Sequence, residues 1–255
     1  MKKLLLFILL TTLLFSKSIE VVYDVKFGLF GEVGDAKGVF SEDGETYSVE
    51  IDATSSGFAR FISNNRKESH RSYGVIKDGV LRSDTYIQEV STNSSYTLST
   101  FTIDHNAKKV YKNNQKKRWN LNKELIEDSD NTREEPYYAD NDLLTLFFNL
   151  KNMINILEKE GRDEGVLYAV GANKKDGAVD IVLPKGEGLE SAQKLLQTDS
   201  DKIVIATLNQ KIFGSEKGEL AVLLDDEYLA QKAVLKDVML FGDVRGEMIK
   251  KEERD

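Results

Sequence analysis

The chain has 255 residues, of which 40% are hydrophobic and 31% are charged, and it contains only two prolines. This is the composition of a folded protein rather than of a disordered segment. The formal net charge of −8 disfavours a nucleic-acid-binding protein, because such proteins carry basic surfaces. The sequence contains no cysteine and two histidines, which excludes disulfides and thiolate metal sites and disfavours a histidine-rich metal centre. We therefore expect no metal and no cofactor.

The N-terminus has the three parts of a secretory signal peptide. Lys2 and Lys3 form a basic start, an apolar stretch covers residues 4–15, and small residues occupy positions 16 and 18. A helix of that stretch would be roughly 18 Å long, shorter than the roughly 30 Å hydrocarbon core of a bilayer. We predict that residues 1–18 are a cleaved signal peptide and that the mature protein is periplasmic and not integral to the membrane. An uncleaved anchor and secretion from the cell are the alternatives.

The first half of the mature chain alternates between apolar and polar residues. Between residues 20 and 112, segments such as 23–29 and 46–53 show the period of two that is typical of strands with one solvent-exposed face. Turn signals rich in Gly, Asn and Asp separate these segments at spacings of about ten residues. The pattern predicts an antiparallel meander. Residues 113–140 lose the alternation, and we expect a long polar loop there.

The period then changes to that of a helix. Asp142 is a good N-cap, and an apolar stripe runs from Leu143 through Phe147 and Leu150 to residue 157, before Gly161 ends the pattern. We predict one amphipathic helix over residues 142–160. Because most of its first two turns are apolar, this helix must be buried on more than one side.

After the helix the strand patterns resume. They cover residues 166–170, 178–183, 202–213, 219–224, 229–240 and 244–249, interrupted by a short amphipathic helix over 189–196. Without a linker rich in Pro, Gly or Ser, we expect a single domain over residues 19–250 and a charged tail over 251–255. Two domains joined near residue 130 are the alternative.

These elements predict a mainly β (α+β) fold in which a curved antiparallel sheet surrounds a central amphipathic helix. The concave face of such a sheet is apolar, and it holds a ligand cavity unless the helix fills it. We expect the cavity to be lined by sheet residues and covered by the helix as a lid. The alternative is that the helix simply completes the core. The predicted lining residues are Tyr47, Val49, Ile51, Phe58 and Phe61, and the predicted lid residues are Leu143, Phe147 and Leu150.

A series of short motifs resembles a known bacterial family. The motifs are Tyr23 leading to Gly31 and Gly34, Gly57-Phe58, residues 71–75 with 78–81, the aspartate-led helix 142–148, and residues 218–222 continuing through Asp225-Asp226 to 246–248. In this order they resemble the periplasmic family of domain-of-unknown-function 3108. The resemblance implies a half-barrel of antiparallel strands around a helix, similar to the lipoprotein carriers LolA and LolB, which hold acyl chains in their concavity.

No catalytic signature stands out. Ser191-x-x-Lys194 and Ser129-Asp130-Asn131 resemble motifs of penicillin-binding enzymes, but their order along the chain is reversed. His70 and His105 have no acidic partner at a spacing that argues for a triad or a metal site. We therefore predict a non-enzymatic periplasmic binding or carrier protein for an apolar, acyl- or lipid-like ligand. The alternative is an envelope adaptor or scaffold with a fully packed core that acts through contacts with envelope proteins.

Overall fold

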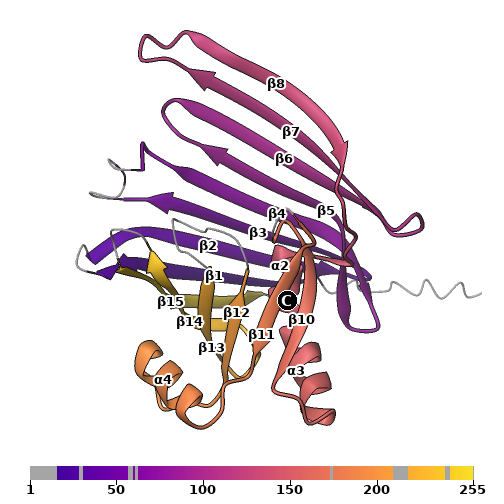
Figure 1. The fold of residues 1–255 in the computed structure, drawn as a ribbon, viewed down its shortest axis with the longest axis vertical. Helices are drawn as coiled ribbons and strands as arrows, with labels where there is room; N and C mark the ends of the chain where they lie inside the picture. Colours follow the sequence, from indigo (N-terminus) through magenta and orange to yellow (C-terminus); the bar gives the residue numbers. More distant parts are fainter. Residues whose placement is uncertain are drawn as a thin grey trace, which may run out of the picture.

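The computed structural model describes residues 16–28, 31–56, 60, 63–172, 175–208, 218–238 and 242–254. They form a mainly β structure in which one large, open, curved sheet of 15 strands carries the helices (Figure 1). The strand order is β8-β7-β6-β5-β4-β3-β2-β1-β15-β14-β13-β12-β11-β10-β9. The sheet is mixed, because β9 and β10 are parallel while the other neighbouring pairs described are antiparallel.

The first eight strands form the predicted meander, since each pairs with the next along the chain. Tight turns join several of them, with Gly44 and Gly79 at the positive φ angles that favour glycine. The strands are β1 (Ser16–Phe27), β2 (Gly31–Asp43), β3 (Thr46–Ser55), β4 (Lys67–Lys77), β5 (Val80–Ser91), β6 (Ser95–Asp104), β7 (Lys109–Trp119) and β8 (Leu125–Glu134).

The predicted loop over residues 113–140 is wrong. The region contains most of β7 and all of β8, which are paired in antiparallel register. Polar side chains hold this hairpin together: Lys116 pairs with Glu127 at 2.9 Å, and the Asn113 amide donates to Asp130 at 2.6 Å. Hydrophobic alternation fails as a signal here because β8 is exposed along most of its length.

The predicted helix over 142–160 is two helices. α2 (Leu143–Phe148) and α3 (Leu150–Lys159) follow the two-residue strand β9 (Asn141–Asp142) and are separated at Asn149. The Asn149 side chain pairs with the backbone of Leu81, accepting from its N–H at 2.9 Å and donating to its carbonyl at 2.8 Å. This link to β5 explains why the helix is interrupted at Asn149.

The second half of the chain supplies the remaining strands and one more helix. These are β10 (Glu164–Val170), β11 (Ala178–Val182), α4 (Glu187–Leu196), β12 (Ile203–Thr207), β13 (Glu219–Leu224), β14 (Ala230–Val238) and β15 (Gly242–Arg254). The predicted charged tail from residue 251 onward is therefore wrong up to Arg254, because β15 continues to that residue. Pairing with β1 explains this extension, since Arg254 lies opposite Ser18.

β1 joins the two halves of the sheet. It pairs with β2 on one side and with β15 on the other, so strands from both ends of the chain lie side by side (Figure 1). Residues 16–18, the end of the predicted signal peptide, belong to β1, whereas residues 1–15 lie outside the described part of the chain. No helix in the described segments is long and apolar enough to span a membrane.

The core is built on both faces of the sheet. On the inner face, α2 and α3 pack against β10–β13 through residues such as Leu150 and Val222, and α2 also packs against β3–β7. On the outer face, Ala192 and Leu196 of α4 cover Ala221 and Leu223 of β13. The sheet curves so far that the Ser83 N–H of β5 donates to the Asp140 carbonyl beside β9, at 3.1 Å.

Candidate functional site

An apolar cavity of about 310 Å³ lies between the sheet and the two inner helices. The sheet contributes residues of β1, β2, β3, β13, β14 and β15, and α2 and α3 supply the opposite wall. This volume falls at the lower end of the range typical of small-molecule sites. The sheet residues that line the cavity include Ile19, Val21, Val25, Ala36, Val39, Val49, Ile51, Leu220, Val222, Ala233 and Gly246.

Strand register explains why so many small side chains meet in one place. Val25 of β1 lies opposite Gly246 of β15, Gly246 lies opposite Ala233 of β14, and Ala233 lies opposite Val222 of β13. Directly paired residues point to the same face of a sheet, so these four positions form one row on the concave side. A Cβ placed at Gly246 would have no atom within 4 Å. Gly and Ala in the middle of this row therefore leave open space above the sheet.

The helices close the other side with large side chains. Phe147 and Leu150 line the cavity, and Phe148 stacks on Phe40 of β2 with the ring centroids 5.1 Å apart. Tyr23 also lines the cavity and donates its hydroxyl hydrogen to the Ala230 carbonyl at 2.9 Å. Burial raises the pKa of Tyr23 to about 12, so the residue is neutral at physiological pH. The site can hold an apolar guest, and its walls offer little polar chemistry.

The structure brings four of the eight predicted site residues together at this cavity: Val49, Ile51, Phe147 and Leu150. Tyr47 lies instead in the adjoining core cluster, where its hydroxyl is 3.1 Å from Ser72 Oγ, and Leu143 packs against the inner clusters without lining the cavity. Phe58 and Phe61 lie outside the described residues.

The lining residues of β1, β2, β13, β14 and β15 were missed by the sequence analysis. Alternation identifies the strands and the face on which each residue lies. It does not reveal that β1, near the start of the chain, pairs with β15, near its end. The small residues Ala233 and Gly246 were the one available signal, because small side chains on the inner face of a curved strand leave space.

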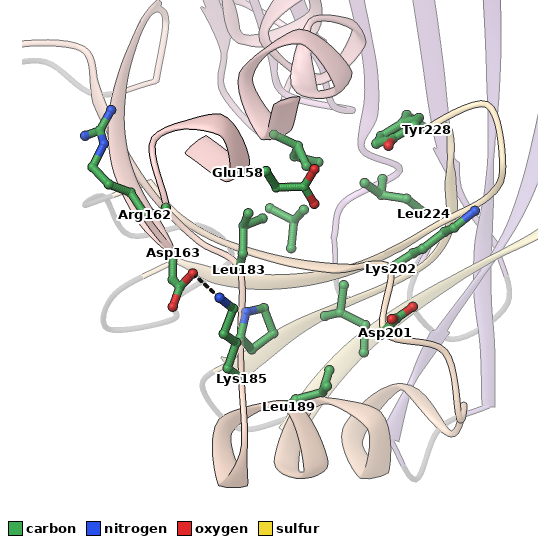
Figure 2. Close-up of a pocket in the computed structure, with 15 residues that line it drawn as sticks. Glu158, Arg162, Asp163, Leu183, Lys185, Leu189, Asp201, Lys202, Leu224 and Tyr228 are labelled. Atoms are coloured by element: carbon green, nitrogen blue, oxygen red, sulfur yellow. Dashed lines mark ion pairs between the residues drawn. The ribbon is translucent and has the colours of Figure 1, made fainter. Parts of the chain in front are cut away.

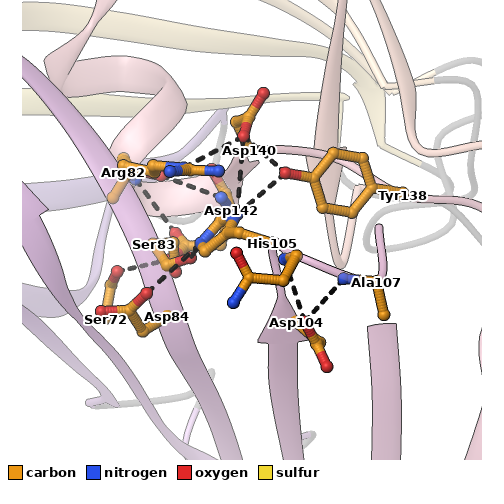
Figure 3. A network of polar contacts seen from close by, with 12 residues as sticks. Ser72, Arg82, Ser83, Asp84, Asp104, His105, Ala107, Tyr138, Asp140 and Asp142 are labelled. Atoms are coloured by element: carbon orange, nitrogen blue, oxygen red, sulfur yellow. Dashed lines mark hydrogen bonds and ion pairs between the residues drawn. The ribbon is translucent and has the colours of Figure 1, made fainter. Parts of the chain in front are cut away.

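A buried polar cluster anchors the start of α2 (Figure 3). Asp142 has no exposed surface, and its carboxylate accepts from the backbone N–H groups of Leu144 and Thr145 and from the hydroxyls of Ser72 and Ser83. Burial raises the pKa of Asp142, and these donors oppose the rise. Because the cluster is sealed from solvent, its role is to fix α2 against β4 and β5, as expected for an N-cap.

A second polar network lies at the surface beside this cluster (Figure 3). His105 Nδ1 is 2.8 Å from the Tyr138 hydroxyl, and its Nε2 is 2.8 Å from the Ser83 carbonyl oxygen. The same ring lies 3.3 Å from an Asp84 oxygen and 3.5 Å from an Asp140 oxygen. The Ser83 hydroxyl donates to Asp142 rather than to His105, so this group is not a serine–histidine catalytic pair.

His70 also has an acidic partner. Its Nε2 lies 3.4 Å from Glu68, and its Nδ1 lies 2.9 Å from the buried Tyr86 hydroxyl. The structure thus adds carboxylate neighbours to two histidines for which the sequence spacing indicated no triad or metal site. Residues two apart share a face of a strand, which places Glu68 beside His70, and the pairing of distant segments places Asp84 and Asp140 around His105.

Metal binding has no candidate site among the residues whose placement is described, since they contain no group of three or more His, Cys, Asp or Glu side chains suited to an ion. Comparisons with known protein families, curated proteins and solved structures find no match to this chain. The cavity geometry is therefore the strongest basis for a functional interpretation.

Proposed function

We propose that the protein is a non-enzymatic periplasmic carrier that holds an apolar, acyl- or lipid-like ligand in the cavity beneath α2 and α3. The observation that carries the proposal is the cavity of about 310 Å³, whose sheet wall consists of apolar side chains and glycines from six strands. Burying apolar ligand surface there is favourable, at about 25 cal/mol per Å². A fully packed core, as an adaptor or scaffold would have, does not account for this space.

We also propose that the fold is a half-barrel. A curved sheet with α2 and α3 on its inner face is compatible with a half-barrel around a central helix, similar to LolA and LolB. The resemblance to the family of domain-of-unknown-function 3108 also points that way. The periplasmic location rests on the predicted signal peptide over residues 1–18.

The test is to fill the cavity without disturbing the fold. Gly246→Leu adds a side chain where no atom lies within 4 Å, so we expect it to keep or raise stability while blocking the cavity. Gly188→Leu is the matched control, because this exposed glycine of α4 lies away from the cavity and its added Cβ would meet only Pro184, at 3.9 Å.

Binding of dodecanol is measured by native mass spectrometry and calorimetry, together with extraction of lipids from protein purified from its own cell envelope. We expect the wild type and Gly188→Leu to bind dodecanol and Gly246→Leu to lose binding at least tenfold. A wild type that binds no dodecanol and repeatedly carries no extracted lipid would overturn the proposal and favour the adaptor.

A further inference from the structure

A second cavity, a cleft of about 500 Å³, lies between the end of α3, the start of β12 and α4 (Figure 2). Three basic and three acidic side chains line it, and Lys185 pairs with Asp163 at 2.6 Å. Equal numbers of the two charges favour neither sign of ligand charge. The charged lining residues are Glu158, Arg162, Asp163, Lys185, Asp201 and Lys202. A more specific polar arrangement surrounds His105.

The curved sheet closes at a seam, where residues 81–84 of β5 meet residues 138–142. The Ser83 N–H donates to the Asp140 carbonyl across this seam, at 3.1 Å. The segment 138–142 includes β9 and leads directly into α2, which supplies part of the wall of the apolar cavity. A group that holds or releases the seam therefore controls how firmly this helical wall is held.

His105 lies at the seam, in the turn after β6, with a side chain that is 13% exposed (Figure 3). Its Nε2 lies 2.8 Å from the Ser83 carbonyl oxygen, which can only accept, so Nε2 carries a hydrogen. Its Nδ1 lies 2.8 Å from the Tyr138 hydroxyl oxygen. Because that hydroxyl donates its one hydrogen to Asp140 at 2.6 Å, Nδ1 carries a hydrogen as well. This is the arrangement of a positively charged imidazole.

The charged groups around the ring match this protonation state (Figure 3). An Asp84 oxygen lies 3.3 Å from Nε2, and an Asp140 oxygen lies 3.5 Å from Nδ1. Arg82 donates to the same Asp140 oxygen, at 3.2 Å. Asp104, at the end of β6, accepts from two N–H groups of the turn. With the ring charged, the imidazole and Arg82 balance the carboxylates of Asp84 and Asp140.

A neutral ring cannot keep all of these contacts. With one hydrogen retained on Nε2 for the Ser83 carbonyl, Nδ1 becomes an acceptor, and the Tyr138 hydroxyl must turn its hydrogen from Asp140 to Nδ1. Asp140 then loses its hydrogen bond from Tyr138 and its contact with the charged ring. Imidazole changes charge between pH 5 and 8. The seam therefore has two hydrogen-bond arrangements that one proton interconverts.

His70, the other of the two histidines, provides a natural control. Its Nδ1 lies 2.9 Å from the Tyr86 hydroxyl, whose oxygen accepts from the Gln88 amide at 3.1 Å. The Tyr86 hydrogen is therefore available to Nδ1, and Nε2 carries the ring hydrogen toward Glu68, at 3.4 Å. A neutral ring satisfies these contacts, so the hydrogen bonds of His70 require no second proton.

We propose that His105 is a proton-dependent latch of the seam. The protonated ring holds residues 138–142 against β5, and loss of the proton loosens this contact and releases the helical wall of the cavity. The latch is therefore closed at the acidic end of the range and opens as pH rises. It requires no bound ligand, so its test is independent of the proposed carrier function.

The first test follows both histidines and the seam in one sample of the wild type. Nitrogen-15 NMR reports the charge of each ring from pH 5 to 8, and hydrogen exchange of the Ser83 and Leu81 amides, which bond across the seam, reports its opening. After correction for base catalysis, the opening constant should rise about tenfold as His105 loses its proton, because a charge-assisted contact is lost. The amides of β13 should show no such rise.

Three variants identify the group that is responsible. His105→Gln removes the charge and keeps a hydrogen-bonding side chain, so its seam should open at every pH as the wild type does at pH 8. His70→Gln is the matched control and should keep the wild-type pH dependence. Tyr138→Phe removes the hydroxyl that links the ring to Asp140, so His105 should still titrate while the pH dependence of the seam shrinks.

The latch is overturned if the wild-type opening constant is the same at pH 5 and pH 8, or if His105 keeps one charge state across this range. It is also overturned if His105→Gln keeps the wild-type pH dependence, because another group would then be responsible. Should a variant fail to fold, the wild-type titration decides alone, since it resolves both rings and the seam. Binding of dodecanol tests the carrier function separately.

Discussion

The two arms of the sheet differ in how they are covered. In the first arm, β2 to β8, most strands keep one face at least partly exposed, and β8 is exposed nearly throughout. In the second arm, β10 to β14, the strands β12 and β13 bury consecutive residues, because α3 packs on the inner face and α4 on the outer face. The comparison shows that alternation of apolar and polar residues indicates a strand buried on one face. A continuous apolar run indicates a strand that is packed on both faces.

The largest effect should come from opening the core of the second arm. Ile181 of β11 has no exposed surface, so Ile181→Ala should lower the free energy of unfolding by about 2–5 kcal/mol. The same substitution in the first arm, at Ile126 of β8, removes a side chain that is 56% exposed and should change the free energy by less than about 0.5 kcal/mol. Urea unfolding followed by circular dichroism measures both. Equal losses would mean that β8 is covered in solution.

A second prediction concerns the link between the arms. Asp142→Ala removes the acceptor of two buried hydroxyls and two backbone N–H groups, so the free energy of unfolding should fall by about 2–4 kcal/mol. Asp140→Ala, two residues away and with a side chain that is 60% exposed, should cost less than about 1 kcal/mol. Thermal and urea unfolding check both. A loss at Asp140 as large as that at Asp142 would contradict the anchoring role of the buried cluster.

Much of the fold can be predicted from the sequence where burial is periodic. The strand over residues 219–224 and the N-cap at Asp142 were predicted and are confirmed. The hairpin of β7 and β8 was not predicted, because its cross-strand hydrogen bonds and ion pairs leave no hydrophobic period. The break at Asn149 was missed for a related reason, since its cause is a contact with Leu81, 68 residues earlier in the chain.

The candidate site is less predictable than the fold. Val49 and Ile51 were predicted to line the cavity because the apolar face of a curved sheet must face the apolar stripe of the helix that packs on it. The cleft that Glu158 and Asp201 line was not predicted, since these residues come from segments far apart in the chain. Sequence patterns identify which face a residue occupies, whereas cavities depend on which distant faces meet.

The smallest predicted effect is a difference in pH dependence between Asp142 and Asp140. Burial raises the pKa of Asp142, so its contribution to stability is present below the ordinary value of about 3.8 and is lost as pH rises through the folded-state pKa. Burial would also raise the pKa of Asp140, but the Tyr138 hydroxyl and Arg82 outweigh it and lower that pKa. The contribution of Asp140 is therefore present above about 3.8 and is lost as pH falls through its folded-state pKa.

The measurement is the free energy of unfolding from pH 3 to 7 for the wild type, Asp142→Asn and Asp140→Asn. The advantage of the wild type over Asp142→Asn should shrink as pH rises, and its advantage over Asp140→Asn should grow. If both stability differences change with pH in the same direction, the four donors around Asp142 outweigh the desolvation of its carboxylate. The Asp142 carboxylate would then be held ionised in the core by the two hydroxyls and the two backbone N–H groups that donate to it.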